Sequence, residues 1–353
     1  MHFRRLISIA PLLKVSIFTV SLGLFSIQAA SQVFSEGSGL DSSLGKKFFE
    51  DFSHKVYTSN DRSADIYYKG GSTSNSRGAI LFLHGFGVNP LTNAGLLHLN
   101  YLAEKEDLAL IFPIGKVGLS PDNEKKISWN ATPRCCGYSY PGLRTSEIPI
   151  PDDESYIIDI TRLALEDRNL KIARDKIYIF GFSNGAFMGH TLACRHSELF
   201  KGLIAYAGTS FKNPSECRPS HPINILQIHG TKDLIIRYDN APVPPPVIRN
   251  KNQLWFPPPT QIVERWKNLN RCRPFKRQSS YDWIAQQVQP NPNHIGEDIL
   301  VIDQVPAAGL IDTDAAYFED CAYGSVGFWT VRNGTHMNLF TTKAITAAFN
   351  YIK

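Results

Sequence analysis

Short, almost continuous apolar runs, separated by stretches with helical periodicity, limit what this chain can fold into. The apolar runs lie at 78–83, 108–112, 177–180, 202–206, 223–228 and 325–331, and the helical stretches at 96–106, 152–169, 184–195, 260–269 and 340–352. Continuous apolar runs are typical of strands buried on both faces of a parallel sheet, because crossover helices cover those faces. The alternation therefore predicts an α/β fold: a mostly parallel sheet with helices on both faces and a ligand-binding edge at the carboxyl ends of its strands.

The N-terminal segment, residues 1–30, carries the three-part pattern of a secretory signal peptide. Arg4, Arg5 and Lys14 form a positive head, an apolar run follows at 15–27, and small residues at 28–31 suit cleavage. The alternative is an uncleaved membrane anchor, but the uncharged run is shorter than the ~20 residues that a comfortable span needs. We therefore expect a secreted protein, extracellular or periplasmic, without a stable membrane anchor.

The rest of the chain is expected to form one domain. Residues 31–53 are rich in serine and glycine and predict a flexible lead-in, and residues 54–353 hold the predicted sheet, which starts with strands at 54–58 and 64–69. A net charge of +5 without a dense Lys/Arg run argues against nucleic-acid binding. The six cysteines favour disulfides in an exported protein, and their spacing matches no metal site. We expect no metal or cofactor, and the sequence indicates nothing about the oligomeric state.

One serine stands between two glycines where a predicted strand meets a predicted helix, in Gly181-Phe182-Ser183-Asn184-Gly185. A serine hydroxyl is a poor nucleophile and must be presented to a base at an exposed point. A sharp strand-to-helix turn does this, and its tightness leaves no room for side chains at the two flanking positions. We therefore predict that Ser183 is a nucleophile; the alternative is an ordinary glycine-rich turn.

A serine nucleophile needs a general base and a group that orients the base. Asp233 lies just past the strand at 223–228, and His336 lies just past the strand at 325–331. Both would reach the same sheet edge as Ser183, in the chain order serine, acid, histidine. Asp239 stays open as an alternative acid, although it lies farther from the end of its strand.

Other histidines and acids are weaker candidates for these roles. His190 lies well inside the helix after Ser183, and His84 and His229 each end a strand before a glycine, where they would shape loops. Acidic residues also precede the last strand, at the end opposite to the expected site. These are Asp312, Asp314, Glu319 and Asp320.

The oxyanion hole is predicted to consist of two backbone N–H groups. One belongs to Asn184, the residue after the nucleophile, at the start of the following helix. The other belongs to Phe86, in the glycine-rich turn His84-Gly85-Phe86-Gly87 that follows a predicted strand. Such a turn lets backbone N–H groups approach a substrate oxygen closely.

Several longer stretches, in collinear order over residues 78–336, resemble the secreted α/β-hydrolase family of polyhydroxybutyrate depolymerase-like, feruloyl esterase-like and acetylxylan esterase-like enzymes. The stretches are LFLHGFG, SWNATPRCCG, PDDESYIIDI, GFSNGAFM, LACRHSELF, CRPSHPINILQIHGTKD, ERWKNLNRC and YFEDCAYGSV. The resemblance implies the α/β-hydrolase fold in a single domain and a triad of Ser183, Asp233 and His336. It also implies a disulfide between Cys272 and Cys321. The partners of the other cysteines stay open, and a Cys194–Cys217 pair is one option.

The resemblance implies a secreted serine esterase that hydrolyses carboxylic esters of the hydroxybutyrate-oligomer, feruloyl or acetyl type, free or attached to a polymer or polysaccharide. A serine peptidase on the same fold and a catalytically silent hydrolase-like binding protein are the alternatives. The chain departs from the family beside His336, where Met337 and Asn338 replace a Trp-Pro region and offer less flat surface to a polymer or aromatic ring. We therefore expect small, soluble esters with short acyl chains.

A proline-rich stretch between Asp233 and the helix at 260–269 contains Trp255 and Phe256. Because such a stretch cannot join the sheet, it must cross the surface near the predicted acid. Trp255 and Phe256 are therefore the predicted wall of the acyl site. The alternative is a rigid surface loop that makes no substrate contact.

Overall fold

The computed structural model describes residues 42–71, 76–119, 125–132, 135–136, 150–239, 256–273, 302–303, 310–311, 313–318, 320–338 and 340–353. The predicted signal peptide and Trp255 lie outside the described residues. No helix within the described ranges is both long and apolar enough to cross a membrane.

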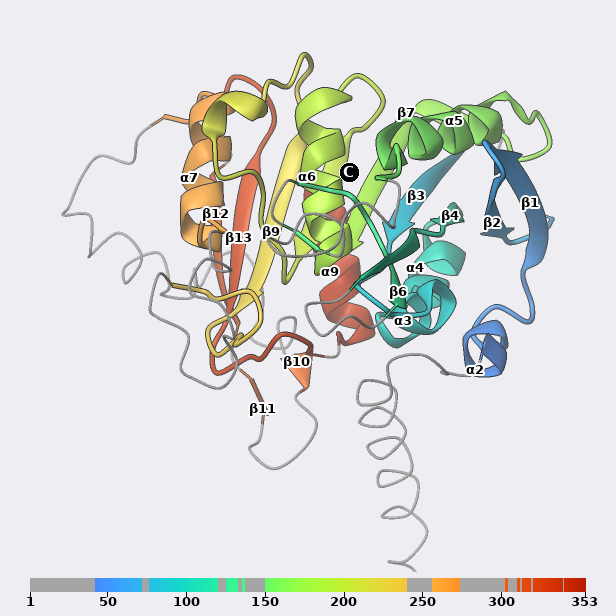
Figure 1. Cartoon of the computed structure of the whole chain (residues 1–353), viewed down its shortest axis with the longest axis horizontal. Coiled ribbons are helices and arrows are strands. Elements are labelled where there is room, and N and C mark those ends of the chain that lie inside the picture. Colours follow the sequence, from blue (N-terminus) through green and yellow to red (C-terminus); the bar gives the residue numbers. More distant parts are fainter. Residues whose placement is uncertain are drawn as a thin grey trace, which may run out of the picture.

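The described residues form one large sheet of nine strands in the order β1-β2-β4-β3-β7-β8-β9-β13-β12 (Figure 1). The strands are β1 Ser53–Ser59, β2 Arg62–Tyr68, β3 Arg77–Leu83, β4 Leu108–Pro113, β7 Ile172–Phe182, β8 Gly202–Tyr206, β9 Asn224–Gly230, β12 Thr313–Phe318 and β13 Val326–Val331. The run from β4 to β13 is parallel, and the pairs β1–β2, β2–β4 and β12–β13 are antiparallel. Every residue of β3, β4, β8 and β13 is buried, which explains why these strands read as continuous apolar runs.

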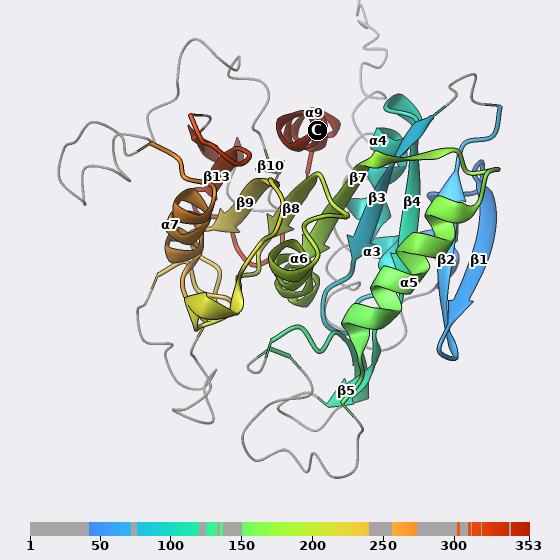
Figure 2. The same cartoon turned by 90° about the horizontal axis from the view of Figure 1, so that it is seen from above.

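Helices cover both faces of this sheet (Figure 2). One buried cluster contains residues of α5 (Asp153–Glu166), α6 (Asn184–Arg195) and α7 (Pro259–Leu269), and the other contains residues of α3 (Pro90–Leu96), α4 (Leu99–Lys105) and α9 (Thr342–Ile352). Smaller described elements are α2 (Ser42–Lys47), the 3-10 turn η2 (Pro214–Glu216), the hairpin β5 (Lys116–Leu119) with β6 (Lys125–Ser128), and β10 (Ile302–Asp303) with β11 (Leu310–Ile311). The predicted α/β architecture is confirmed.

Three local expectations differ from the structure. The helix expected at 96–106 is two short helices, because His98 between them has a left-handed backbone with φ 58° and α3 starts earlier, at Pro90, behind an Asn89 cap. The lead-in at 31–53 was expected to be flexible, but its described part contains α2, and Phe49 is buried against the core. The antiparallel edge strand β12 was missed, because its residues TDAAYF are not a continuous apolar run.

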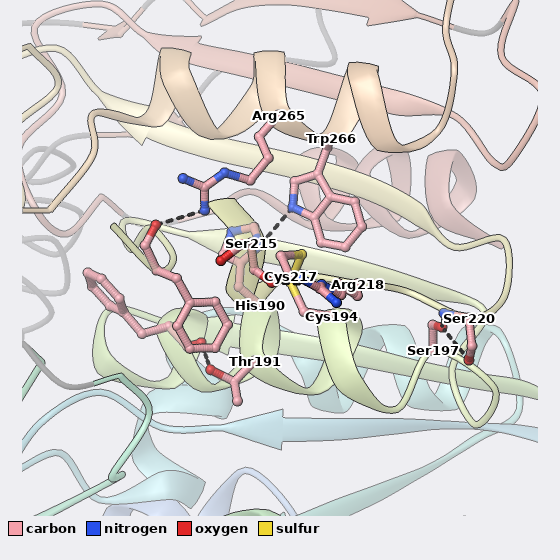
Figure 3. The surroundings of a disulfide bond; sticks show 12 residues. His190, Thr191, Cys194, Ser197, Ser215, Cys217, Arg218, Ser220, Arg265 and Trp266 are labelled. Atoms are coloured by element: carbon pink, nitrogen blue, oxygen red, sulfur yellow. Dashed lines mark hydrogen bonds between the residues drawn. A yellow bond between two sulfur atoms is a disulfide. The ribbon is translucent and has the colours of Figure 1, made fainter. Parts of the chain in front are cut away.

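The six cysteines form three disulfides: Cys135–Cys136, Cys194–Cys217 and Cys272–Cys321. The last of these is the pair that the family resemblance implies. Cys194–Cys217 joins α6 to the loop after η2, and Figure 3 shows its surroundings. Cys135 and Cys136 are adjacent in the chain, so their disulfide ties no distant elements together.

Candidate active site

Ser183 lies in a turn too tight for side chains on either side. It follows β7 and precedes α6, with φ 53° and ψ −118°, a positive-φ conformation that costs free energy for a residue with a Cβ. A Cβ on Gly181 would lie 2.4 Å from the carbonyl oxygen of Gly185, and a Cβ on Gly185 would lie 1.9 Å from the carbonyl oxygen of Leu83. The two glycines therefore allow the turn that holds Ser183 at the carboxyl edge of the sheet.

The histidine and the aspartate predicted from the sequence meet Ser183 at this edge. His336 Nε2 lies 2.8 Å from Ser183 Oγ, and His336 Nδ1 lies 2.8 Å from Asp233 Oδ2. Because a carboxylate only accepts hydrogen bonds, Nδ1 carries the proton and Nε2 accepts from the serine hydroxyl. Residues far apart in the sequence come together because β7, β9 and β13 run parallel and end at the same edge.

Asp233 is held as an ionised carboxylate. Its Oδ1 accepts from the backbone N–H groups of Ile235 and Ile236, both at 2.8 Å. Burial acts to raise the pKa of Asp233, but the neighbouring His336 and hydrogen bonds from His229 and His336 hold the pKa below its ordinary value. Asp233 can therefore orient the imidazole of His336 and stabilise its protonated form.

The alternative acid pairs with an arginine. Asp239 has a side chain that is 64% exposed, and it pairs with Arg237. Asp320 is also exposed, and it pairs with Arg273. The structure therefore places only Asp233, among the acids of the described residues that we considered, against the histidine.

Asp314 corrects one geometric argument from the sequence. We expected it at the end of the last strand opposite to the site, but β12 runs antiparallel to β13 and places Asp314 beside Thr330, near the carboxyl end of β13. There it forms an ion pair with Arg332. Asp312 and Glu319 lie outside the described residues.

The two predicted oxyanion residues flank Ser183. Asn184 is the first residue of α6, so its backbone N–H has no partner within the helix. A Cβ built on Gly85 would lie 3.5 Å from the Cβ of Ser183, which shows that the turn containing Phe86 lies against the nucleophile. Gly87 allows this turn with φ 69°, and its N–H donates to the carbonyl of Ile127 at 2.8 Å.

Trp129, which the sequence analysis missed, connects the two sides of the oxyanion region. Its backbone N–H donates to Asn184 Oδ1 at 2.7 Å, and its indole N–H donates to the carbonyl of His84 at 3.0 Å. His84 Nε2 accepts from the N–H of Gly115, so its Nδ1 carries the proton that bonds the Gly85 carbonyl at 2.8 Å. Burial lowers the pKa of His84 to about 4, in keeping with this neutral form. His84 therefore shapes the loop.

Hydrogen bonds from Tyr206 and Asn338 hold the loop that carries His336. Tyr206 hydroxyl donates to the carbonyl of Asn338 at 2.9 Å, and the amide side chain of Asn338 bonds the N–H and carbonyl of Thr335, both at 3.1 Å. Asn338 is 1% exposed, and Met337 packs against the core. Asn338 therefore offers no side chain to a substrate surface, because its amide closes the turn.

Phe256 is the part of the predicted acyl wall that the structure describes. It is half-buried, and its ring meets that of Phe187 in α6 edge-on, with centroids 4.9 Å apart. This contact fixes Phe256 to the helix that begins at the candidate nucleophile. Among the described residues, no group of three or more His, Cys, Asp or Glu side chains is arranged to hold a metal ion.

Comparisons with known proteins agree with this architecture. Residues 71–251 match the model of the phospholipase/carboxylesterase family. A curated relative from Nocardia uniformis subsp. tsuyamanensis, named "Putative esterase NocK", is 29% identical over 164 residues. That match covers 42% of this chain and 46% of the relative, so the chain spans less than half of the relative's length.

The chain is also similar to two solved structures at low sequence identity. An acetyl xylan esterase from Aspergillus awamori is 14% identical, with 85% of this chain and 99% of that chain covered and a TM-score of 0.49. A ferulic acid esterase from Anaeromyces mucronatus, in complex with ferulic acid, is 14% identical, with coverage of 85% and 89% and a TM-score of 0.41. The family match spans half of the chain, and the chain therefore belongs to the phospholipase/carboxylesterase family of α/β-hydrolases.

Proposed function

We propose that the protein hydrolyses carboxylic esters through an acyl-enzyme formed on Ser183. The observation that carries this proposal is the unbroken series of hydrogen bonds from Ser183 through His336 to Asp233. The family match and the relative named as an esterase support the same class of reaction.

Each group of the candidate site has a role in the proposed reaction. His336 Nε2 takes the proton of Ser183 as Oγ attacks the ester carbonyl carbon, and then gives that proton to the alcohol oxygen when the ester C–O bond breaks. In the second half, water gives a proton to Nε2 and attacks the acyl carbon. The bond between that carbon and Oγ then breaks, Nε2 returns the proton to Oγ, and the carboxylic acid leaves. The backbone N–H groups of Phe86 and Asn184 stabilise the oxyanion in both halves.

Replacing the nucleophile tests the proposal most directly. Ser183→Ala should lower kcat for a soluble ester by about 10⁴-fold or more and abolish labelling by a fluorophosphonate probe, because no other group can form the acyl-enzyme. Ser210→Ala is the matched control, since Ser210 is also buried and its hydroxyl bonds no described residue. Retention of more than a few per cent of the activity in a clean Ser183→Ala preparation would refute the assignment.

Two other functions are separated by the same reagents. A catalytically silent binding protein would not be labelled by the fluorophosphonate. A serine peptidase would also be labelled, but it would cleave the matched amide at a measurable rate in addition to the ester. We expect labelling together with hydrolysis of the ester alone.

The substrate that we propose is a small, soluble ester with a short acyl chain. The contact of Phe256 with Phe187 supports an aromatic wall that narrows the acyl side. A series of p-nitrophenyl esters tests this: the rate should be greatest for short acyl chains, and a maximum at twelve carbons or more would contradict it. Hydroxybutyrate oligomers, feruloyl esters and acetylated xylan would then distinguish the natural ester.

We also propose that the protein is exported after removal of the N-terminal segment. Three disulfides among the six cysteines support an oxidising compartment, because thiols stay reduced in most cytosols. N-terminal sequencing of the protein recovered from outside the cytoplasm should find a start near residue 31. A mature protein that still begins at Met1 would contradict the proposal.

A further inference from the structure

A row of buried polar side chains leads through the core to the candidate acid. It begins at Trp266 on α7, passes His190 on α6, and continues through Gln227 and His229 on β9 to Asp233. The first four side chains belong to residues that are 0% exposed. Figure 3 shows the first link, between the indole nitrogen of Trp266 and the ring of His190. The reaction steps proposed above assign no role to the first four of these side chains.

The donor at Trp266 fixes the direction of the first hydrogen bonds. An indole nitrogen only donates, so Trp266 Nε1–H donates to His190 Nδ1 at 3.1 Å, and that nitrogen has no proton. Burial lowers the pKa of His190 to about 4, so the ring is neutral and carries its proton on Nε2. His190 Nε2–H therefore donates to Gln227 Oε1 at 3.0 Å.

The rest of the row follows the same direction. With its oxygen on His190, Gln227 turns its amide nitrogen to the carbonyl of Gly208 at 2.9 Å and to His229 Nδ1 at 3.5 Å. His229 then carries its proton on Nε2, which faces the carbonyl of Ile236 at 2.6 Å. The carbonyls of Gly208 and Ile236 only accept, so two independent anchors agree with the direction that Trp266 sets.

His229 ends this row on the candidate acid. Its Nε2 lies 3.3 Å from Asp233 Oδ2, the same oxygen that accepts from His336 Nδ1 at 2.8 Å. The other carboxylate oxygen is bonded by the N–H groups of Ile235 and Ile236. His229 thus contacts both the Ile236 carbonyl and the Asp233 carboxylate in the turn at 233–236. Because both carboxylate oxygens have partners, the side chain of Asp233 has little freedom to rotate.

We propose that His229 is a positioning residue for Asp233, and that the row of hydrogen bonds from Trp266, together with the carbonyls of Gly208 and Ile236, sets the direction in which His229 donates. If the row reversed, a lone pair on His229 Nε2 would face the Ile236 carbonyl and the carboxylate of Asp233, and this repulsion would turn the carboxylate away from His336. The role rests on the proposed function, because it matters for catalysis only if Asp233 orients the base.

Substitutions at His229 test the last link. His229→Phe keeps a ring but removes both nitrogens, and kcat for a soluble ester should fall about 10- to 100-fold with KM unchanged, as expected for loss of a hydrogen bond to a charged group. His229→Gln keeps a donor near the Nε2 position and should recover kcat to within about threefold of the wild type. If both variants melt like the wild type and His229→Phe keeps kcat within twofold, the positioning role is overturned.

Substitutions at two tryptophans test the distant end. Trp266→Phe removes the donor that sets the direction, whereas Trp329→Phe removes an equally buried indole that bonds the Tyr317 hydroxyl at 3.0 Å, outside the row. We expect Trp266→Phe to lower kcat at least about threefold more than Trp329→Phe, because only the former frees His190 to change tautomer. Equal kcat values for the two variants would overturn the role of the row. This pair decides alone if His229→Phe does not fold.

Proton NMR keeps the proposal separable from the proposed function. The strongly downfield resonance of His336 Nδ1–H reports its bond to Asp233 whether or not the protein turns over any ester. It should shift in His229→Phe and return toward the wild-type position in His229→Gln. An unchanged resonance in folded His229→Phe would overturn the positioning role. If the resonance shifts between the variants as expected but the wild type hydrolyses no ester, only the proposed function is refuted.

Discussion

The two sides of the candidate site are built in different ways. On the oxyanion side, His84, Trp129 and Asn184 bond mainly to backbone groups: the Gly85 carbonyl, the Gly115 N–H and the backbone of Trp129. On the acid side, His190, Gln227 and His229 bond in series through their side chains. Each side contains a buried histidine whose pKa is lowered to about 4, yet the first arrangement fixes a backbone shape and the second fixes where protons lie.

Disturbance of the two sides should therefore have different kinetic signatures. A distorted backbone on the oxyanion side should move the N–H groups that are proposed to stabilise the oxyanion, so it should destabilise the transition state and leave substrate binding unchanged. A misplaced donor on the acid side should disturb the orientation of His336, the proposed base. Substitutions on each side test this distinction.

The largest effect is expected for Asp233→Asn, on the acid side. The amide cannot hold the imidazole of His336 in the required tautomer, so kcat should fall by about 10⁴-fold while the protein stays folded. Asp239→Asn is the matched control and should stay within about twofold of the wild type, since Asp239 is exposed and forms a surface ion pair with Arg237. Steady-state kinetics on one soluble ester decide; a crippling Asp239→Asn beside a mild Asp233→Asn would reverse the assignment.

Asn184→Ala addresses the oxyanion side. The substitution leaves the backbone N–H in place but removes the amide that bonds Trp129 at 2.7 and 3.1 Å, and kcat should fall about 10- to 100-fold, less than for complete loss of an oxyanion donor. The pH of half-maximal kcat should stay the same, because the base is untouched. Asn93→Ala is the control, since Asn93 is equally buried and its side chain bonds no described residue. A shifted pH profile in Asn184→Ala would break the distinction between the two sides.

The stability of both sides should depend on pH in the same window. His84 and His190 have pKa values lowered from 6.5 to about 4 by burial, so the unfolded chain binds more protons than the folded chain between these values. The free energy of unfolding is not reduced by these histidines above pH 6.5, and it falls as the pH drops from 6.5 toward 4. The total reduction is at most on the order of 3 kcal/mol per histidine. Chemical denaturation at several pH values measures the slope.

Replacement of one histidine at a time assigns that slope to its side. His84→Gln should remove the contribution of the oxyanion side to the slope of stability against pH. His190→Gln should remove the contribution of the acid side. Neither expectation depends on how the substitution changes stability at neutral pH. Asp233 reduces the stability further only as the pH falls below its ordinary pKa of 3.8, because its pKa in the folded protein is lowered and not raised. A slope that neither substitution changes would show that other groups cause the acid sensitivity.

The smallest effect is expected for Phe256→Ala. Loss of its contact with Phe187 should raise KM for short acyl esters about two- to fivefold, with little change in kcat, because binding is affected equally in the ground state and the transition state. The series of p-nitrophenyl esters provides the measurement, and Tyr323→Ala, an exposed aromatic residue, is the control. If both constants stayed unchanged, Phe256 would belong only to the packing of the surface.

The sequence allowed prediction of those features that local pattern controls. Gly181 and Gly185 mark the tight turn, and the alternation of buried runs and helices predicts that Ser183, Asp233 and His336 lie near one edge. Asp314 was misplaced because the direction of an edge strand depends on its partner, which residue order alone does not reveal.

The supporting residues around the site could not be predicted for a related reason. Trp129 and His229 act through contacts with distant parts of the chain, and each has an ordinary local pattern. Nothing in the residues beside Asn338 indicates that it is buried and that it bonds Tyr206. Hydrogen bonds between distant segments are decided by how the layers pack, and periodicity carries no information about them.

The end of α7 is fixed to the segment just before β13. Cys272 and Cys321 are joined by a disulfide and an isolated bridge, and the backbone of Arg273 and Tyr323 adds hydrogen bonds to Asp320 and Asn270 across the same junction. Because Cys272 and Cys321 fix the end of α7 to the segment just before β13, this junction holds β13 in place together with its pairing to β9 and β12. A foreign insert or a deletion beside this junction that leaves β12 intact should therefore keep the candidate catalytic edge in register.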